Sequence, residues 1–168
     1  MATSFTHEQR YAADPATVMA MLADPAFVER KCARTGSIDT TVAVDQPSDG
    51  TIVISATRVL PLPDDMPGPA RTLVGDSVTV TEVQTWTAPA PDGSRTAQVR
   101  ADFAGQVAFT ATMSLMPAGS GSTVALSGSL KASIPFIGGK IEKTVAEQTV
   151  RYLDEEQRVG SEWLASAH

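Results

Sequence analysis

The stretch that decides the fold is residues 134–164, IPFIGGKIEKTVAEQTVRYLDEEQRVGSEWL. In this stretch Ile134-Pro135 ends a strand, Gly138-Gly139 makes a turn, and a long helix is expected over residues 141–164. Apolar residues spaced 4, 7, 7 and 4 positions apart fall on one side of such a helix. The residues of this apolar stripe are Ile141, Val145, Tyr152, Val159 and Trp163. At 1.5 Å per residue the helix would be roughly 36 Å long and would need a large apolar partner.

The opposite side of this helix is charged. It offers two pairs in the favourable order, Glu147–Arg151 and Asp154–Arg158, in which the partners are four residues apart. Lys143 lies on the same side. We therefore expect this side of the helix to face water.

Polar residues interrupt the apolar side of the helix. Gln148 falls within the stripe, and Glu156 lies between the stripe and a second apolar patch. That second patch contains Ala146, Val150, Leu153 and Leu164. A buried carboxylate without a partner costs several kcal/mol or is neutralised by a raised pKa. Glu156 is therefore expected to pair with an arginine, to line a wet cavity, or to reach solvent.

Length and composition indicate one domain over residues 1–168, large enough to fold without a disulfide or a metal. Cys32 is the only cysteine, which excludes an internal disulfide and a cysteine-rich metal site. The first residues, MATSFTHEQRY, contain no apolar run, so they do not resemble a secretory signal. No segment approaches the roughly 20 apolar residues that span a bilayer. We expect a cytoplasmic protein with no integral membrane segment.

The net charge of the chain and the distribution of its basic residues indicate which partners it can bind. The formal net charge is −6, and lysines and arginines form no cluster along the sequence. Both observations argue against binding to nucleic acid and to anionic membrane surfaces.

The first forty residues predict one strand and two short helices. Residues 4–11 alternate between the two sides of a strand. Asp14-Pro15 and Asp24-Pro25 then each place an N-cap acceptor before a proline at the first helical position. Gly36 is suited to end the second helix.

From Ile38 onward the pattern has the period of two that is typical of strands. The expected strands are residues 38–44, 51–59, 77–86, 95–103, 107–116 and 123–134. Ala104-Gly105 would form a bulge or a tight turn between two of them. Residues 60–69 contain four prolines and are expected to form a loop with exposed Leu62 and Met66.

This order of elements predicts an α+β fold. Successive strands joined by short turns are antiparallel, and one apolar face indicates that one side of the sheet is covered. The terminal helix is the one element long enough to cover it. We therefore expect a curved antiparallel sheet of about seven strands, in the order β-α-α-β6-α, wrapped around that helix.

The sequence also resembles a known superfamily. The order of elements is similar to the helix-grip fold of START-like, or SRPBCC, proteins. More narrowly, IPFIGGKIEK followed by AEQTVRYLDEEQRVGSEWL resembles an actinobacterial family of uncharacterised proteins, as does the helix pair DPATVMAMLADPAFVERK. The most specific part is residues 138–142, GGKIE. The resemblance covers nearly the whole chain and implies a cavity between helix and sheet. It transfers no catalytic residue, and the superfamily includes binders of lipids, sterols, hormones and polyketides as well as some enzymes.

Signals for catalysis or metal binding are weak. The two histidines are His7, on the first strand, and His168, the last residue. His7 shares a strand face with Phe5 and Gln9, which is typical of an ordinary strand residue. No histidine, cysteine or acidic cluster has metal-ligand spacing. Gly138-Gly139-Lys140 lacks the full phosphate-loop pattern, because Ile141 follows the lysine. We expect no catalytic residue of a known motif, no metal and no cofactor.

No motif indicates ligand binding, and the case for it depends on the volume that the apolar side chains fill. A sheet lined largely by small side chains, opposite a single helix, leaves room for a small hydrophobic molecule such as a lipid or a polyketide-like acid. Methionines are adaptable cavity liners. The side chains expected to contact the ligand are Trp86, Phe109, Met113, Gln148, Tyr152 and Glu156.

Two alternatives stay open. In the first, the protein is an enzyme of the cyclase or hydrolase type that uses Glu156 as general acid and base. In the second, it is an interaction module that forms a homodimer through Val150, Leu153 and Leu164 and binds no ligand.

Overall fold

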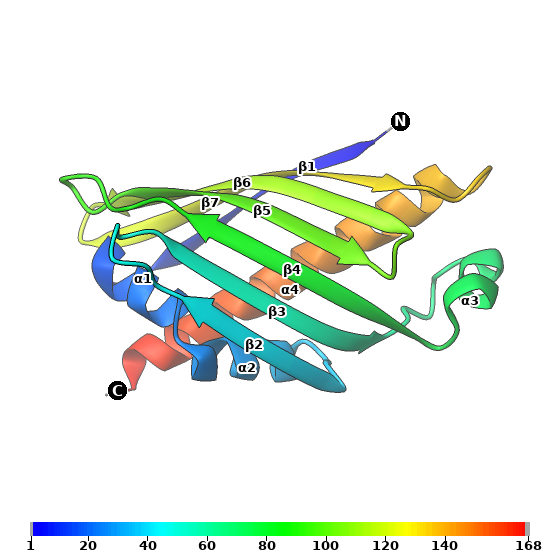
Figure 1. Ribbon diagram of the computed structural model, residues 1–168, viewed down its shortest axis with the longest axis horizontal. Coiled ribbons are helices and arrows are strands. Elements are labelled where there is room, and N and C mark those ends of the chain that lie inside the picture. Colours follow the sequence, from blue (N-terminus) through cyan, green and yellow to red (C-terminus); the bar gives the residue numbers. More distant parts are fainter. Residues whose placement is uncertain (1, 167–168) are drawn as a thin grey trace.

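The computed structural model describes residues 2–166 (Figure 1). The first half of the chain contains β1 (Thr3–Tyr11), α1 (Pro15–Leu22), α2 (Pro25–Arg34), β2 (Asp39–Asp45), β3 (Ile52–Pro61) and α3 (Gly68–Val74). The second half contains β4 (Ser77–Trp86), β5 (Arg95–Phe103), β6 (Val107–Ala118), β7 (Gly121–Ala132) and α4 (Gly138–Ala165).

The seven strands form one antiparallel sheet in the order β1-β7-β6-β5-β4-β3-β2. The sheet curves, and α4 crosses its concave side from one end to the other (Figure 1). Helices α1 and α2 lie toward the end where α4 finishes, and α3 lies at the opposite end (Figure 1). The expected curved sheet of seven strands around a terminal helix is confirmed.

The two short helices begin where the sequence predicts. The Asp14 carboxylate accepts a hydrogen bond from the backbone N–H of Thr17 at 2.8 Å, and Asp24 accepts one from Ala26 at 2.9 Å. These bonds satisfy amide groups that have no partner within the first turn of a helix. The second helix is followed by Gly36, whose φ of 92° is the left-handed conformation that glycine adopts readily.

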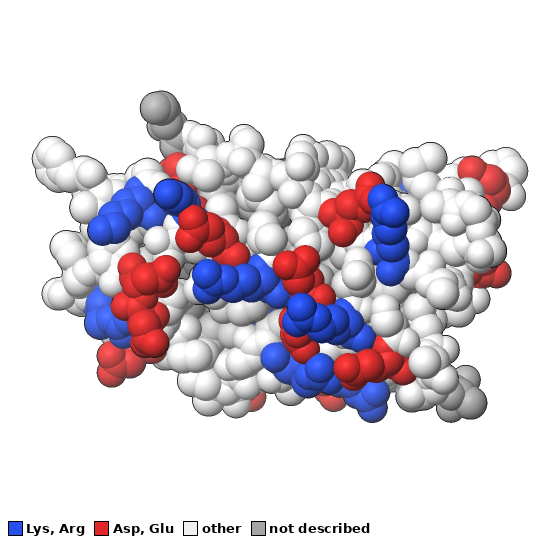
Figure 2. Space-filling view, turned by 180° about the vertical axis from the view of Figure 1, so that it is seen from behind, with Lys and Arg blue, Asp and Glu red and all other residues white. Residues whose placement is uncertain are grey.

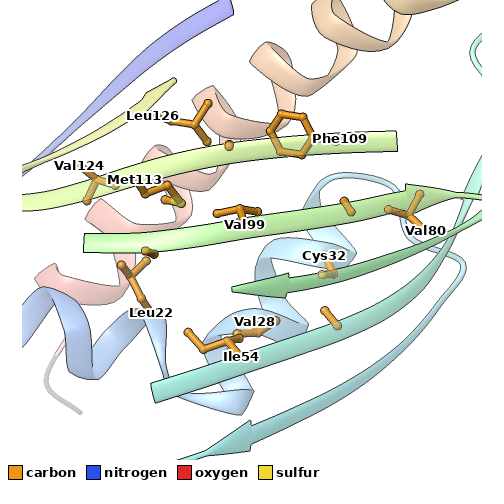
Figure 3. Close-up of a cluster of buried hydrophobic side chains, with 14 of the residues drawn as sticks. Leu22, Val28, Cys32, Ile54, Val80, Val99, Phe109, Met113, Val124 and Leu126 are labelled. Atoms are coloured by element: carbon orange, nitrogen blue, oxygen red, sulfur yellow. The ribbon is translucent and has the colours of Figure 1, made fainter. Parts of the chain in front are cut away.

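The inward faces of the strands form the core. Side chains of β3 to β7 turn toward those of α1 and α2 in a common apolar cluster (Figure 3). Along β6 the alternation is strict, because Phe109, Ala111, Met113 and Leu115 are buried while the residues between them face outward. Ala104 and Gly105 make a tight turn between β5 and β6 with φ angles of 52° and 71°.

The proline-rich segment was only partly predicted. Its first two residues, Leu60 and Pro61, belong to the end of β3. The helix α3, which was not expected, begins at Gly68, within the last residues of the expected loop. The expectation that Leu62 is exposed was wrong, because its side chain is buried, and Met66 is half-buried against the core. Proline at the first positions of a helix is favourable, so the prolines start α3.

Helix α4 begins at Gly138, so the glycine pair is the start of the helix and the turn precedes it. Its apolar stripe is buried apart from Tyr152, which is half-buried. Basic and acidic side chains alternate along its outer surface (Figure 2). The partners differ from those expected, because Asp154 contacts His7 at 2.8 Å and Arg158 contacts Glu155 at 2.9 Å.

Two further features concern residues 2–166 only. No helix in this range combines the length and the apolar character required to cross a membrane. No three histidine, cysteine or acidic side chains in this range are grouped as metal ligands would be. His168 lies outside the described residues.

Gly128 on β7 leaves the space that the ring of Phe109 occupies. A Cβ atom at Gly128 would lie 2.5 Å from Cε2 of Phe109, which stacks on Phe5 with 5.8 Å between ring centroids. Gly128→Val is therefore expected to lower the free energy of unfolding by about 1–3 kcal/mol through overpacking. Urea denaturation measures this change.

The control for Gly128→Val is Ser127→Val, because Ser127 is the neighbouring residue on the exposed outer face of β7. It adds the same side chain to the same strand without touching Phe109. An equal loss of stability in both variants would show that strand pairing, and not the aromatic ring, is the sensitive feature.

Candidate functional site

Two cavities lie between the sheet and α4. The first, cavity 1, has a volume of about 70 Å³, and the second, cavity 2, has a volume of about 60 Å³. A water molecule needs roughly 10–15 Å³ by this measure, so both cavities are large enough for water. The walls of both include Phe103, Thr149 and Tyr152, so these side chains separate the two spaces.

Cavity 1 has an apolar side and a polar side. The apolar side comes from the inward faces of β5, β6 and β7, among them Phe109, Met113 and Leu126 (Figure 3). The polar side comes from α2, β3, β4 and α4. Its charged and amide residues are Lys31, Arg58, Glu82, Gln84 and Glu156.

The centre of the polar side is an ion pair between two helices. Lys31 Nζ of α2 donates to Glu156 Oε2 of α4 at 2.9 Å, and the two side chains are only 13% and 12% exposed. Burial alone would lower the pKa of Lys31, but the charges of Glu156 and Glu82 more than offset this and raise it. Lys31 is therefore held in its charged form.

A hydrogen-bonded chain continues along β4. The indole N–H of Trp86 donates to Gln84 Oε1 at 3.0 Å, and Gln84 Nε2 donates to Glu82 Oε1 at 2.9 Å. All three residues face the interior because they alternate with outward-facing residues of the strand. The chain orients the carboxylate of Glu82, which is part of the wall of cavity 1.

Arg58 of β3 also belongs to the polar side. Its Nη1 atom donates to Thr35 Oγ1 at 3.0 Å and lies 3.9 Å from Cys32 Sγ. The guanidinium group lies over the ring of Tyr152, with 5.3 Å from Cζ to the ring centroid. Burial raises the pKa of the Tyr152 hydroxyl, although Arg58 and Arg151 act in the opposite direction. Tyr152 therefore stays neutral.

Cavity 2 is almost entirely apolar. It lies between α3 with its preceding loop and the first half of α4. Leu62, Met66 and Val74 contribute from the α3 side, and Ile141 and Val145 from α4. This space suits a hydrocarbon or aromatic group rather than a charged one.

The structure brings together five of the six side chains expected to contact a ligand. Phe109, Met113, Tyr152 and Glu156 line cavity 1, while Gln148 and Tyr152 line cavity 2. Trp86 is fully buried outside both walls and reaches cavity 1 only through Gln84. Ligand contact by these residues stays a prediction. The partner of Glu156 is Lys31 and not an arginine, which was one of the expected options.

The sequence analysis did not identify four polar residues as part of the site. Arg58 lies an even number of residues from Ile52 and Ile54 on β3, so it shares their face of the sheet. Glu82 and Gln84 share a face with Val80 on β4 in the same way. This alternation is the signal that could have placed the three side chains in the interior. Lys31 of α2 was not considered as a partner for Glu156, and only the fold shows that the two side chains meet.

The two cavities together can hold a molecule that has one polar end and one apolar end. Two carboxylates and two cationic groups meet in cavity 1, so its wall can both donate and accept hydrogen bonds. An apolar space continues on the other side of Tyr152. The same carboxylates beside a charged lysine could exchange protons with a bound molecule.

The patch considered for dimerisation is partly used within the molecule. Leu153 and Leu164 pack against the core, and Leu153 also lines cavity 1. Val150 is half-buried. Homodimer formation through this patch stays a prediction.

Comparison with solved structures identifies the fold. A protein from Thermus thermophilus, TTHA0849, matches with a TM-score of 0.67 at 16% identity, over 98% of this chain and 100% of that one. A START superfamily protein from Mycobacterium smegmatis matches with a TM-score of 0.57 at 15% identity, over 97% and 98%. Norcoclaurine synthase from Thalictrum flavum, in complex with dopamine and hydroxybenzaldehyde, matches with a TM-score of 0.56 at 10% identity. The match covers 100% of this chain and 90% of that one. The fold is therefore START-like.

Comparison of sequences identifies the family. An uncharacterized protein from Mycobacterium tuberculosis strain H37Rv is 30% identical over 128 residues, which are 74% of this chain and 72% of that one. Residues 6–164 match the family described as "Protein of unknown function (DUF2505)". The chain therefore belongs to the DUF2505 family and has a START-like fold.

Proposed function

We propose that this protein binds a small, mainly hydrophobic molecule with one polar end, of lipid or polyketide-like type. The apolar part would occupy cavity 2 and the polar end cavity 1. The observation that supports this most is the set of inward-facing Arg58, Glu82 and Gln84 beside open space in an otherwise apolar interior. Buried polar groups cost free energy unless they are paired, so an interior with only a structural role would have little reason to keep them.

Arg58 is the residue best placed to bind the polar end. Its Nη1 atom is used by Thr35, while its other nitrogens have no hydrogen-bond partner among residues 2–166. A guanidinium group presents donors in a planar fork that matches carboxylate and carbonyl oxygens. The polar end is therefore expected to be a hydrogen-bond acceptor.

Tyr152 lies where the ligand would pass between the two cavities. Its ring forms part of both walls and is half-buried, so a rotation of the side chain would join them. The complex of norcoclaurine synthase with dopamine and hydroxybenzaldehyde supports the proposal, since a protein of similar fold is bound to small organic molecules there.

A cavity-filling variant tests the proposal. Protein purified from its own host is expected to carry bound mass of lipid size in native mass spectrometry. Ala101→Met places a longer side chain in cavity 1 and should weaken binding of the amphipathic anion anilinonaphthalene sulfonate by about tenfold. Fluorescence titration measures this affinity.

The matched control is Ala108→Met, because Ala108 is exposed on the outer face of β6. It should bind the probe as the unchanged protein does. Protein that is always free of ligand, together with equal probe binding by both variants, would contradict the proposal.

The enzymatic alternative has one observation in its favour. A carboxylate and a charged amine, Glu156 and Lys31, are in contact at the wall of cavity 1, where a proton could be transferred. Their mutual ion pair favours a structural role for Glu156. The stability of Glu156 variants, treated in the Discussion, separates the two roles.

A further inference from the structure

Arg58 and Glu82 carry opposite charges on neighbouring strands but do not pair with each other. In the register of β3 and β4, Arg58 lies opposite Val80 and Glu82 lies opposite Ala56, so the two are diagonal neighbours on the inward face. Diagonal neighbours are roughly 7–8 Å apart, which long side chains can bridge. No ion pair joins Arg58 to Glu82 among residues 2–166, although both line cavity 1.

Each of the two side chains is held by neighbours of its own. The guanidinium group of Arg58 donates to Thr35 Oγ1 at 3.0 Å and lies over the ring of Tyr152, 5.3 Å from Cζ to the centroid. The Glu82 carboxylate accepts from Gln84 Nε2 at 2.9 Å. These separate contacts keep a hydrogen-bond donor and a hydrogen-bond acceptor apart on one wall. A donor and an acceptor fixed in advance bind a ligand at a low cost in ordering.

The formal charges on the wall of cavity 1 cancel. Its basic residues are Lys31 and Arg58, and its acidic residues are Glu82 and Glu156. Lys31 and Glu156 neutralise each other directly, with 2.9 Å between Nζ and Oε2. A ligand with an ionised end would add one uncompensated charge between this wall and the apolar side of the cavity, which costs free energy. The balance of charges therefore favours a polar end without a charge.

From this pair we infer that the polar end of the ligand is uncharged and carries a carbonyl group beside a hydroxyl or N–H group. Arg58 donates to the carbonyl oxygen, and Glu82 accepts from the hydroxyl or N–H group. The inference rests on the proposed function and narrows it, because an acceptor alone would use Arg58 and leave Glu82 without a bond to the ligand. Hydroxyketones and primary amides have such an end, whereas simple esters and fatty-acid anions do not.

Three molecules with the same hydrocarbon chain test the inference. They are octanamide, which has a carbonyl and an N–H group, methyl octanoate, which has no donor, and octanoate, which is charged. Their affinities for the full chain are measured by isothermal titration calorimetry at about pH 8, well above the pKa of a carboxyl group. Octanamide is expected to bind about tenfold more tightly than either of the other two, because a polar wall left unpaired or a buried charge left unbalanced weakens binding.

Glu82→Gln tests the balance of charges on the wall. It removes one negative charge while keeping the size of the side chain and an acceptor oxygen, so the affinity for octanoate should rise about tenfold relative to that for octanamide. The matched control is Glu147→Gln, because Glu147 is exposed on α4 and lines neither cavity. It changes the net charge of the chain equally and should leave the relative affinities as they are.

The outcomes separate this inference from the proposed function. Methyl octanoate or octanoate binding to the unchanged protein as tightly as octanamide would overturn the inference alone, since a small hydrophobic molecule is still bound. Relative affinities that do not change in Glu82→Gln, or that change equally in Glu147→Gln, would overturn it in the same way. Absence of binding by all three molecules would overturn the inference and would also count against the proposed function. The comparison on the unchanged protein needs no variant to fold.

Discussion

Glu156→Leu is expected to lower the free energy of unfolding by about 3–5 kcal/mol. The substitution leaves Lys31 buried at 13% exposure without the carboxylate that Nζ contacts at 2.9 Å. The charge of Glu82 offsets only part of this cost, because no ion pair within 4.0 Å joins it to Lys31 among residues 2–166. Urea denaturation followed by circular dichroism measures the loss.

A double variant shows whether the loss comes from the isolated charge. Lys31→Met together with Glu156→Leu removes both charges and keeps similar volumes, so it should be much more stable than Glu156→Leu alone. Glu156→Gln should fall between the unchanged protein and Glu156→Leu, since the amide oxygen can still accept from Nζ. If the double variant were as unstable as the single one, packing around residue 156 would be the cause instead.

The pH dependence of stability offers a second check on the same pair. The pKa of Lys31 is raised in the folded protein, so its contribution is fully present below 10.5 and is lost as pH rises through the higher folded value. Without Glu156, burial dominates and should lower the pKa of Lys31. Stability of Glu156→Leu should then rise with pH on the approach to 10.5, opposite in sign to the unchanged protein. The double variant supplies the baseline from other groups.

These measurements also decide between the structural and the enzymatic role of Glu156. An enzyme that uses Glu156 only for proton transfer should keep its melting temperature nearly unchanged in Glu156→Gln. A clear loss of stability assigns the carboxylate to the ion pair. Ligand binding by Arg58 and the apolar walls is compatible with that outcome, because neither requires a free carboxylate at position 156.

Much of the fold could be predicted because local rules and tertiary packing agree along most of the chain. Strand β4 was expected at residues 77–86 and lies there, since its alternation, its flanking turns and its burial all coincide. Helix α3 was missed because four prolines in ten residues outweighed the short helical sequence that follows them. Proline disfavours the interior of a helix but not its first turn.

The candidate site was harder to predict than the fold, for a physical reason. Periodicity identifies which side of an element is buried, but it does not identify what lies opposite. The sequence marked Glu156 as an anomaly on α4, whereas its partner Lys31 is 125 residues away on α2. Arg58 and Glu82 were hidden because charged residues in a strand are normally assigned to the solvated face.

Trp163→Ala is expected to lower the free energy of unfolding by about 3–5 kcal/mol, through lost apolar burial and the cavity left behind. The ring is 8% exposed and meets Phe27 of α2 edge-on, with 5.7 Å between centroids and 74° between planes. Arg30 lies over it with 4.9 Å from Cζ to the ring centroid. The substitution therefore removes the apolar contact between the end of α4 and α2, which are also joined there by the ion pair of Arg34 with Glu162 at 2.9 Å.

The remaining tryptophan makes this loss straightforward to measure. Trp86 is fully buried in β4, so its fluorescence reports unfolding of the sheet after Trp163 is removed. Trp163→Phe keeps an aromatic ring against Phe27 and should recover most of the stability, while Arg30→Gln should cost about 0.5–1 kcal/mol as an exposed cation–π partner. An unchanged denaturation midpoint in Trp163→Ala would mean that the end of α4 is not needed to hold the sheet and helix together.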